Sequence, residues 1–384
     1  MSTKQAEPTQ QPGSQHVSAE RIKAQIVSLL DAWGMDADLV RDTAHVMTDT
    51  DLSGVDSHGI SMLMDYNQSR LSGKLNLHAK PHVVRQTPVT AVVDADAGLG
   101  HPAALMGMNL AIERARSMGV GMVVVRNSHH FGAAGYYARM ASEQGLLGLV
   151  TSATRTINTV PTRARVPILG TNPIAFSAPA GRNRAFSLDM ATSSSASNKV
   201  KVYELRGNRV PAGWVLDEKA QTVTDPTQAM DILFRRPKHI GGGLTPLGGT
   251  AEMASHKGYG LAMMVHILAG TLSGSSFSPI RARTQRPQDP DNLGHFFCAI
   301  DPDCFRDEGE FEADLDDVID LLHGAEPADP ALPVLVHGDP EAQARERRLR
   351  EGVPLASTLI EKIRNLCLDA DVPFLLDDNC ESAS

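Results

Sequence analysis

Apolar residues at helical spacing dominate the first recognisable stretch of the chain. Ile22, Ile26 and Leu29 recur three or four residues apart behind Ser18, a residue type that commonly caps the first turn of a helix. A second run of the same kind follows it. The pattern predicts an N-terminal helical segment over residues 18–80.

The stretch before this segment, residues 1–17, is polar and contains no apolar core of the kind that secretory signals require. We expect it to form a disordered tail.

Strand-like apolar runs alternate with helix-length segments further along the chain. The expected strands cover residues 89–94, 121–126 and 146–151, and the expected helices cover residues 102–118 and 133–144. Alternation of this kind is typical of an α/β core.

The remaining chain changes character twice. Residues 160–250 are rich in Gly, Pro and Thr with short β-like runs, which predicts a second lobe with substantial antiparallel sheet. A buried helix is expected over residues 258–272. The acidic run at 301–320 predicts a solvated helix face, and two amphipathic helices are expected around residues 352–354.

Composition narrows the class of protein. The 384 residues carry 36 Lys and Arg against 45 Asp and Glu, a net charge of −9, which argues against a dedicated nucleic-acid binder. No apolar run reaches the roughly 20 residues that a membrane span needs. The four cysteines form no CxxC pair. Reduced thiols and a cytoplasmic location are therefore expected.

A Gly98-Leu-Gly100-His-Pro-Ala103 turn follows the strand that ends at residue 94. The spacing matches the dinucleotide-binding fingerprint of a Rossmann fold. That fingerprint also needs an acidic residue at the end of the next strand, where this chain has Arg126. A tight glycine turn between strand and helix is the interpretation we favour.

Two histidine motifs stand out as candidate chemistry. His58 follows Ser57 in a small-residue loop, where an imidazole is suited to proton transfer or, more simply, to capping a carbonyl. His129 and His130 follow a valine-rich strand, at the strand end where α/β sheets place ligands. No acidic residue or third histidine is spaced to complete a metal site, so no metal is expected.

Small-residue turns with a single polar side chain recur later in the chain. They lie at residues 170–173, at 188–193 with Asp189, at 256–260 with His256 and Lys257, and at 294–296 with His295. Each one alone fits a purely structural turn, but there are more of these turns than structural roles alone explain.

Taken in order, the motifs resemble a known family. The runs SHG, NSHHFGAAGYYA, GTNPIAF, LDMATS, GGLTPLGG, HKGYGLAMMV and NLGHFFCAIDP are similar to those of the type 2 malate/L-lactate dehydrogenases, over roughly residues 18–375. That family includes ureidoglycolate dehydrogenase, sulfolactate dehydrogenase, diketogulonate reductase and the piperideine/pyrroline-2-carboxylate reductases.

The resemblance implies an unusual cofactor lobe. It predicts an α/β protein with the N-terminal helical segment, an α/β substrate and dimer lobe (residues 81–155 with 275–384), and a largely antiparallel, non-Rossmann lobe that binds NAD or NADP (residues 156–274). It also implies a homodimer.

The resemblance further implies site residues. His58 matches the proton donor and Asp189 its partner, while His130 matches a residue that competes with His58 for the acid/base role. Ser57 is expected to help hold the substrate. The expected cofactor contacts are Ala185, Phe186, Ser187, Leu188, Asp189, Met190, Ala191, His256, Lys257, Gly294, His295 and Phe296.

One departure concerns the substrate. Many members read SHGxxR, with the arginine near the substrate carboxylate, whereas this chain has Met62 at that position. Another cation must then replace it, and the candidates are Arg70, Arg163, Arg165 and Lys257.

These observations lead to one hypothesis and several rivals. The hypothesis is hydride transfer between NAD(P)H and C2 of a small 2-oxo or 2-hydroxy acid, with His58 exchanging the proton. The nearest alternative is a reductase of cyclic 2-imino acids. A non-catalytic NAD(P)-binding protein and a metal-dependent hydrolase are more distant alternatives.

Overall fold

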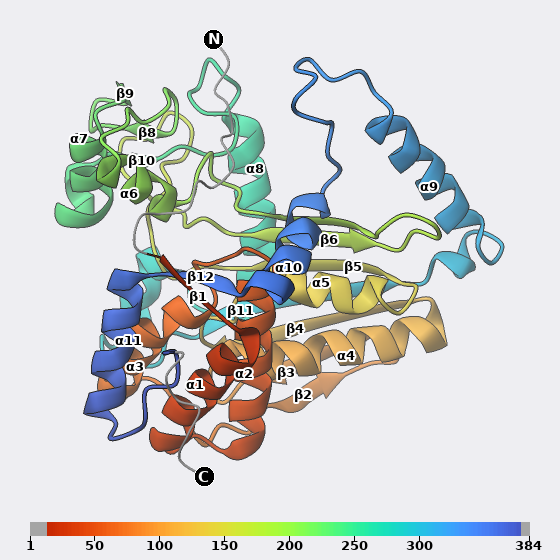
Figure 1. The fold of residues 1–384 in the computed structure, drawn as a ribbon, viewed down its shortest axis with the longest axis horizontal. Helices are drawn as coiled ribbons and strands as arrows, with labels where there is room; N and C mark the ends of the chain where they lie inside the picture. The colour runs from red at the N-terminus through yellow and green to blue at the C-terminus, as the bar shows by residue number, and fades with distance from the viewer. Residues whose placement is uncertain (1–13, 378–384) are drawn as a thin grey trace. The chain divides into compact units, whose positions relative to one another are not determined.

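The computed structural model describes residues 14–377, which form a mixed α/β protein of two compact units (Figure 1). The first, here called the helical unit, holds the chain up to His78 together with the chain from Asp339 onward. The second, the sheet unit, runs from Ala79 to Gly338.

The helical unit is built on the predicted N-terminal helices. α1 (Ala19–Ala32) begins at Ser18, whose side chain accepts a hydrogen bond from the Arg21 backbone N–H. It buries the predicted apolar residues and packs against α2 (Ala37–Leu52). The unit also contains η1 (Ile60–Met62), α3 (Leu63–Leu71), α10 (Asp339–Glu351) and α11 (Ser357–Asp369).

A two-stranded sheet joins the start of the described chain to a segment near its other end. β1 (Ser14–Val17) pairs antiparallel with β12 (Val353–Ala356). Residues 14–17 are therefore a strand and not part of a tail, because their backbone groups find partners far along the sequence. The rest of the predicted tail, residues 1–13, lies outside the described residues.

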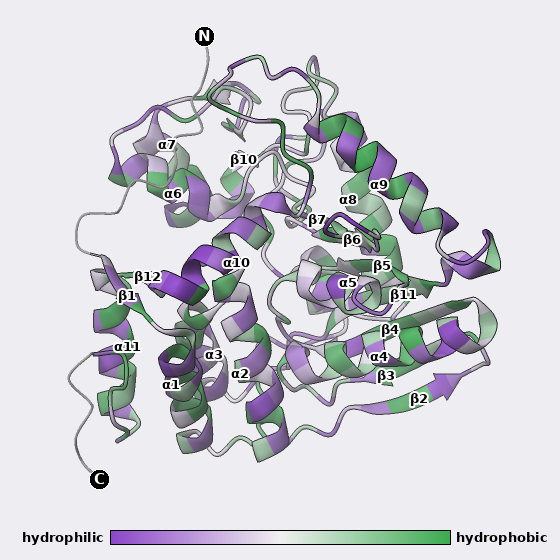
Figure 2. Cartoon of the chain, turned by 45° about the vertical axis from the view of Figure 1, so that its right-hand side comes forward, coloured by the Kyte–Doolittle hydropathy of each residue, from purple (hydrophilic) through white to green (hydrophobic). Residues whose placement is uncertain are grey.

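The C-terminal segment belongs with the helical unit. α10, which is mostly hydrophilic (Figure 2), sends Arg345 and Arg348 to the carboxylates of Asp49 and Asp56. The sequence had placed this segment in one lobe with residues 81–155. The ion pairs and the β1–β12 pairing, both long-range contacts, account for the difference.

A seven-stranded sheet organises the sheet unit. Its order is β2 (His82–Gln86), β3 (Thr90–Asp94), β4 (Val120–Ser128), β11 (Leu293–Ile300), β5 (Leu147–Ser152), β6 (Ile174–Ala178) and β7 (Phe186–Met190). Only β3 and β4 are parallel, and the other neighbours are antiparallel. β11 enters between β4 and β5 from a distant part of the sequence.

Helices cover both faces of this sheet. α4 (Gly100–Met118) and α5 (Ala134–Ser142) lie on one face (Figure 1), where the Cβ of an alanine at Gly121 would sit 2.0 Å from the Ala111 carbonyl oxygen. Glycine in β4 thus lets α4 approach closely. On the other face, η4 (His266–Thr271) packs Ala269 against Val124 and Phe296.

A smaller lobe lies within the sheet unit, between residues 197 and 244. It contains α6 (Ser197–Leu205), α7 (Pro226–Met230), η2 (Asp231–Arg235), η3 (Lys238–Ile240) and a three-stranded antiparallel sheet of β8 (Val215–Leu216), β9 (Thr222–Val223) and β10 (Gly243–Leu244). It has its own apolar core, which includes Val200, Val215 and Leu244.

Two sequence expectations need correction here. The predicted buried helix is α8 (His256–Val265) continued by η4, and it leaves Ile267 and Leu272 more than half exposed. The acidic helix α9 (Glu310–His323) is not solvated throughout, because Asp316 is buried and accepts hydrogen bonds from the backbone N–H groups of Arg182 and Asn183.

The segment 278–292 holds the short helix η5 (Ser278–Arg283), and η6 (Pro302–Cys304) follows β11.

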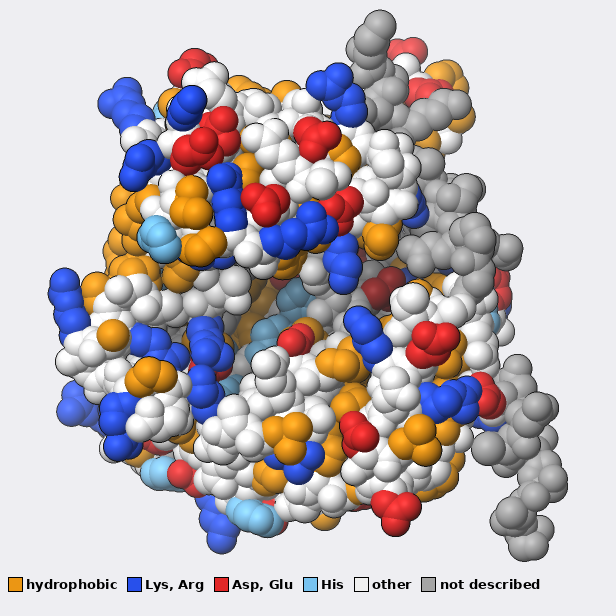
Figure 3. All heavy atoms as spheres, turned by 90° about the vertical axis from the view of Figure 1, so that its left-hand side faces the viewer, with side chains coloured by type: hydrophobic (Ala, Val, Ile, Leu, Met, Phe, Trp, Pro, Cys, Tyr) orange, Lys and Arg blue, Asp and Glu red, His pale blue; other side chains and the backbone are white. Residues whose placement is uncertain are grey.

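Acidic and basic side chains are interspersed on the face shown in Figure 3, and no single-sign basic patch covers it. None of the helices in residues 14–377 is long and apolar enough to cross a membrane.

Candidate active site

The loop that follows α2 carries the first candidate residues. Ser57 Oγ lies 2.7 Å from His58 Nδ1, so the two predicted side chains are hydrogen-bonded to each other. The His58 backbone N–H donates to the Val55 carbonyl oxygen, which closes a tight turn. Burial lowers the pKa of the His58 imidazole below its usual value. The imidazole is therefore mostly neutral at pH 7.

The same loop rests on a buried carboxyl group that the sequence analysis did not single out. Asp51, in the last turn of α2, accepts a hydrogen bond from the Ile60 backbone N–H at 2.8 Å. Burial raises the pKa of Asp51 to about 8, against the opposing effect of that hydrogen bond. The sequence signal for it was weak, because polar residues in the last turn of an amphipathic helix usually face solvent.

In the sheet unit, His129 and His130 follow the end of β4, as predicted. His129 is buried, and its Nδ1 lies 3.5 Å from a carboxylate oxygen of Asp291. Arg155 and Arg281 also pair with Asp291. Burial alone would raise the pKa of Asp291, but its hydrogen bond to His129 and the neighbouring positive charges lower it.

Neither Asp291 nor Arg155 was predicted as a site residue, because they lie in loops without a motif. Within residues 14–377, no group of three or more His, Cys, Asp or Glu side chains is placed to hold a metal ion.

The glycine turn before α4 is filled by protein. The Gly100 backbone N–H donates to the His130 carbonyl oxygen at 2.9 Å, and a Cβ at Gly100 would meet the His129 carbonyl oxygen at 2.5 Å. A pyrophosphate at a helix N-terminus needs such N–H groups to be accessible. The geometry supports the tight-turn interpretation over a Rossmann site.

Asp189 lies on the edge strand β7, where its side chain is exposed. One carboxylate oxygen accepts a hydrogen bond from the Gly135 backbone N–H at 2.7 Å, in the first turn of α5. Negative charge is favourable at a helix N-terminus. This contact anchors the carboxylate between β7 and α5.

The predicted cofactor segment Ala185–Ala191 coincides with this edge strand. Most of its side chains are half-buried. A segment that the sequence analysis missed lies against it: the Ser187 backbone N–H donates to the His337 carbonyl oxygen, and the His337 ring packs on Phe186 at 5.5 Å.

The other two predicted cofactor segments differ in accessibility. His256 and Lys257 are exposed at the first turn of α8. Gly294, His295 and Phe296 are buried in β11, at the centre of the sheet.

His295 is committed to contacts within the sheet. Its Nδ1 lies 2.8 Å from Ser152 Oγ and its Nε2 lies 3.0 Å from Ser128 Oγ. The Phe131 ring stacks on it at 4.3 Å. Burial lowers the pKa of His295 to about 3. These contacts favour a structural role over the predicted contact with a cofactor.

The candidate cations also differ. Arg70 donates to Asn67 and lies over the Trp33 ring at 5.3 Å. Arg163, Arg165 and Lys257 are exposed.

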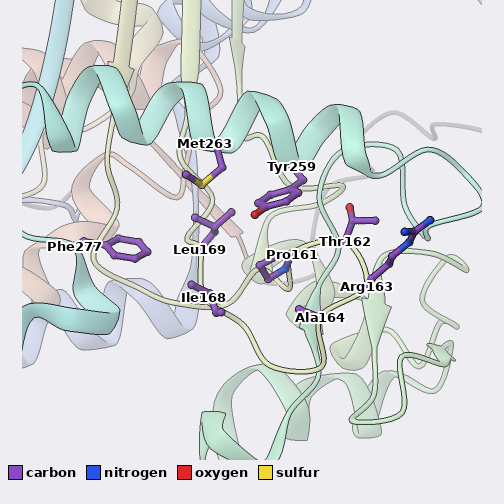
Figure 4. A pocket seen from close by; sticks show the side chains of 9 residues that line it. All are labelled: Pro161, Thr162, Arg163, Ala164, Ile168, Leu169, Tyr259, Met263 and Phe277. Carbon is purple, nitrogen blue, oxygen red and sulfur yellow. The ribbon is translucent and has the colours of Figure 1, made fainter.

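An apolar cavity of about 530 Å³ lies in the sheet unit (Figure 4). Tyr259 and Met263 of α8 face Leu169 across it, and Phe277 closes one end. Arg163 belongs to its lining, but the guanidinium points away from the apolar side chains. The volume is typical of small-ligand sites, although none of the predicted catalytic residues lines this cavity.

The neutral state of His295 predicts how stability depends on pH. The unfolded chain takes up the proton near pH 6.5 and the folded chain near pH 3, so the free energy of unfolding falls as the pH drops through this window. We expect a slope of up to about 1.4 kcal/mol per pH unit from this residue. Denaturant unfolding of wild type and His295→Gln between pH 7 and pH 4 measures it. Parallel pH curves for the two proteins would refute the assignment.

Comparisons with known proteins agree with the motifs. A family model described as malate/L-lactate dehydrogenase matches residues 17–364. A malate dehydrogenase of Pyrococcus horikoshii is 35% identical over 91% of this chain and 94% of its own. An L-sulfolactate dehydrogenase of Methanothermobacter thermautotrophicus is 35% identical over 92% of this chain and 95% of its own.

A solved structure shares the fold as well. The crystal structure of malate dehydrogenase from Entamoeba histolytica superposes with a TM-score of 0.87 at 32% identity, covering 94% of this chain and 99% of that one. The chain therefore belongs to the malate/L-lactate dehydrogenase family and is a dehydrogenase of that family.

Proposed function

We propose that this protein transfers a hydride between NAD(P)H and C2 of a small 2-oxo or 2-hydroxy carboxylic acid. Family membership and relatives named malate and sulfolactate dehydrogenase support the substrate class. The observation that carries the chemistry is the Ser57–His58 hydrogen bond, which fixes a low-pKa imidazole in a short loop.

The nicotinamide, when bound, supplies the hydride for reduction or accepts it in oxidation. His58 handles the proton. In reduction a C–H bond forms at C2, the electron pair of the C=O double bond moves to oxygen, and that oxygen takes a proton from the His58 imidazolium. In oxidation the neutral imidazole takes the proton back. Its lowered pKa makes it ready to act as the base at pH 7.

Other residues take supporting roles in this proposal. Asp189 stabilises the charged form of the imidazole during turnover, while Ser57 and His130 orient the substrate oxygens. The Ser57 hydroxyl already bonds to the His58 ring.

The residues of the sheet unit fit a dinucleotide. Lys257 places positive charge in the first turn of a ten-residue helix, next to the His256 side chain, an arrangement suited to a diphosphate. The Ala185–Ala191 segment contains the edge strand β7, which has no neighbouring strand on its outer side, where only the Ser187 N–H is described as bonded, to the His337 carbonyl oxygen. We assign cofactor contacts to these two segments, and we leave out the buried Gly294–Phe296 segment.

A reductase of cyclic 2-imino acids is the second candidate. Relatives in the family carry that activity in their names. The feature that favours it is Met62, because η1 carries no cation for an open-chain carboxylate after His58.

A substrate panel separates these functions. Oxidation of NADH or NADPH is followed by absorbance with pyruvate, oxaloacetate, 3-sulfopyruvate, diketogulonate and pyrroline-2-carboxylate. We expect turnover with at least one open-chain 2-oxo acid. Turnover with the cyclic imine alone identifies the reductase, and cofactor binding without any turnover contradicts both proposals.

Replacing His58 by Ala should remove the proton donor but not the cofactor site. We expect kcat to fall by about 10²–10⁴. The affinity for NAD(P)H, measured by nicotinamide fluorescence, should stay within about twofold. In wild type, the reduction rate should rise as the pH falls below 6.5, because the pKa of His58 is lowered. Turnover of His58→Ala close to that of wild type would exclude this role.

We also propose a homodimer. Met264, Ile267 and Leu272 are exposed apolar side chains along α8, η4 and the residue after it, and such surfaces commonly lie in interfaces. Light scattering should give twice the chain mass of 41.2 kDa for wild type. We expect Ile267→Glu to give a monomer with an unchanged circular dichroism spectrum. Leu205→Glu, which changes an exposed leucine of α6 in the smaller lobe, serves as the control and should remain a dimer. A wild-type monomer would contradict the proposal.

A further inference from the structure

Asp51 is a buried carboxyl group that the proposed proton transfer does not use. It lies in the last turn of α2, where the side chain is about 1% exposed. A carboxyl group is seldom fully buried unless its partners compensate for the lost hydration.

The partners of this carboxyl group belong to the loop that carries His58. Asp51 Oδ2 accepts a hydrogen bond from the Ile60 backbone N–H at 2.8 Å. A Cβ at Gly59 would lie 1.8 Å from Asp51 Oδ1, so a side chain there would displace the carboxyl group. The Asp51 carboxyl group therefore packs directly on the two residues that follow His58.

The arginines near this carboxyl group make their hydrogen bonds and ion pairs with other acceptors. Arg348 of α10 donates to the Asp51 carbonyl oxygen and to the Asp56 carboxylate. The Arg345 guanidinium, from the same helix, pairs with Asp49. The Asp56 carboxylate acts on Asp51 as a like charge and Arg348 as an opposite one.

We propose that Asp51 is a positioning residue: its carboxyl group holds the backbone of Gly59 and Ile60 and so sets the direction of the His58 imidazole. The expected effect of Asp51 on turnover rests on the proposed role of His58. The expected effect of Asp51 on the conformation of the loop does not.

The charge state gives the proposal a measurable signature. Burial raises the pKa of Asp51 to about 8, so the group is mostly neutral at pH 7. Loss of its proton above this pH places a charge in a buried site beside the Asp56 carboxylate. We expect the loop to loosen and the His58 imidazole to leave its working orientation.

Kinetics of hydroxy-acid oxidation test this, because the base His58 is already neutral at alkaline pH. Asp51→Asn keeps the shape and an acceptor for the Ile60 N–H, so kcat at pH 7 should stay within about threefold of wild type. Asp51→Ala removes the acceptor and should lower kcat by about 10–100-fold, as misplaced catalytic groups do.

The pH profile separates positioning from a purely structural role. Wild-type kcat should decline above about pH 8, the value to which the pKa of Asp51 is raised, and Asp51→Asn should lack this decline. Asp65→Asn removes an exposed carboxyl group of α3 in the same unit and should keep it. The proposal is overturned by a decline that persists in Asp51→Asn, or by its absence in wild type.

Two further readouts do not depend on turnover. The raised pKa of Asp51 makes the folded chain bind more protons than the unfolded chain between about pH 4 and pH 8, so stability falls as the pH rises through this range. Asp51→Asn should therefore gain in Tm relative to wild type from pH 5 to pH 8. The His58 imidazole resonances, assigned with His58→Gln, should shift near pH 8 in wild type only.

If the substrate panel shows no turnover, the proposed function fails, while these two readouts still decide the role of Asp51. A constant Tm difference, together with His58 resonances that titrate alike in both proteins, would refute the positioning role.

Discussion

Strand β11 supplies hydrogen-bond partners to the backbone groups of two strands that would otherwise form edges of the sheet. It pairs antiparallel with β4 along one side and with β5 along the other. Buried backbone groups without partners cost free energy comparable to a lost hydrogen bond each, so the sheet depends on this inserted strand. The His295 side chain reinforces the arrangement by bonding to Ser128 at the end of β4 and Ser152 at the end of β5.

The pairing of β4 with β11 also fixes the chain segment that follows β4. The His129–His130 segment follows directly. The His130 carbonyl oxygen accepts a hydrogen bond from the first turn of α4, and the His129 carbonyl oxygen lies close to that turn and to the His295 ring. The side chains are then held by the Asp291 ion pairs on one side and the chain around Gly132 on the other. The backbone of this loop is thus used in structural contacts within the sheet unit.

The sequence predicted regular elements well where local periodicity determines them. Ser18 and its apolar repeat specify α1, and the valine run specifies β4, because burial of one face or of a whole strand leaves a direct mark on the residues. β1 and β11 were not predicted, since each exists only through pairing with residues far away in the chain.

The same division holds for the candidate site. The Ser57–His58 pair is local, and its motif drew attention to it, although its expected role came from the family resemblance. Asp51 and Asp291 act through tertiary contacts, to the Gly59–Ile60 backbone and to His129, Arg155 and Arg281, which no spacing reveals. His295 was expected to contact the cofactor because of the family resemblance, and only the sheet shows that both its nitrogens face serine hydroxyls.

The central claim is direct transfer of hydrogen between the nicotinamide and the substrate carbon. It is tested by turnover of a 2-oxo acid with NAD(P)H that carries deuterium at both C4 positions, followed by NMR and mass analysis of the product. We expect one deuterium at C2 of the hydroxy acid and none on its oxygen after exchange with water. A product that contains only solvent hydrogen at C2 would contradict it.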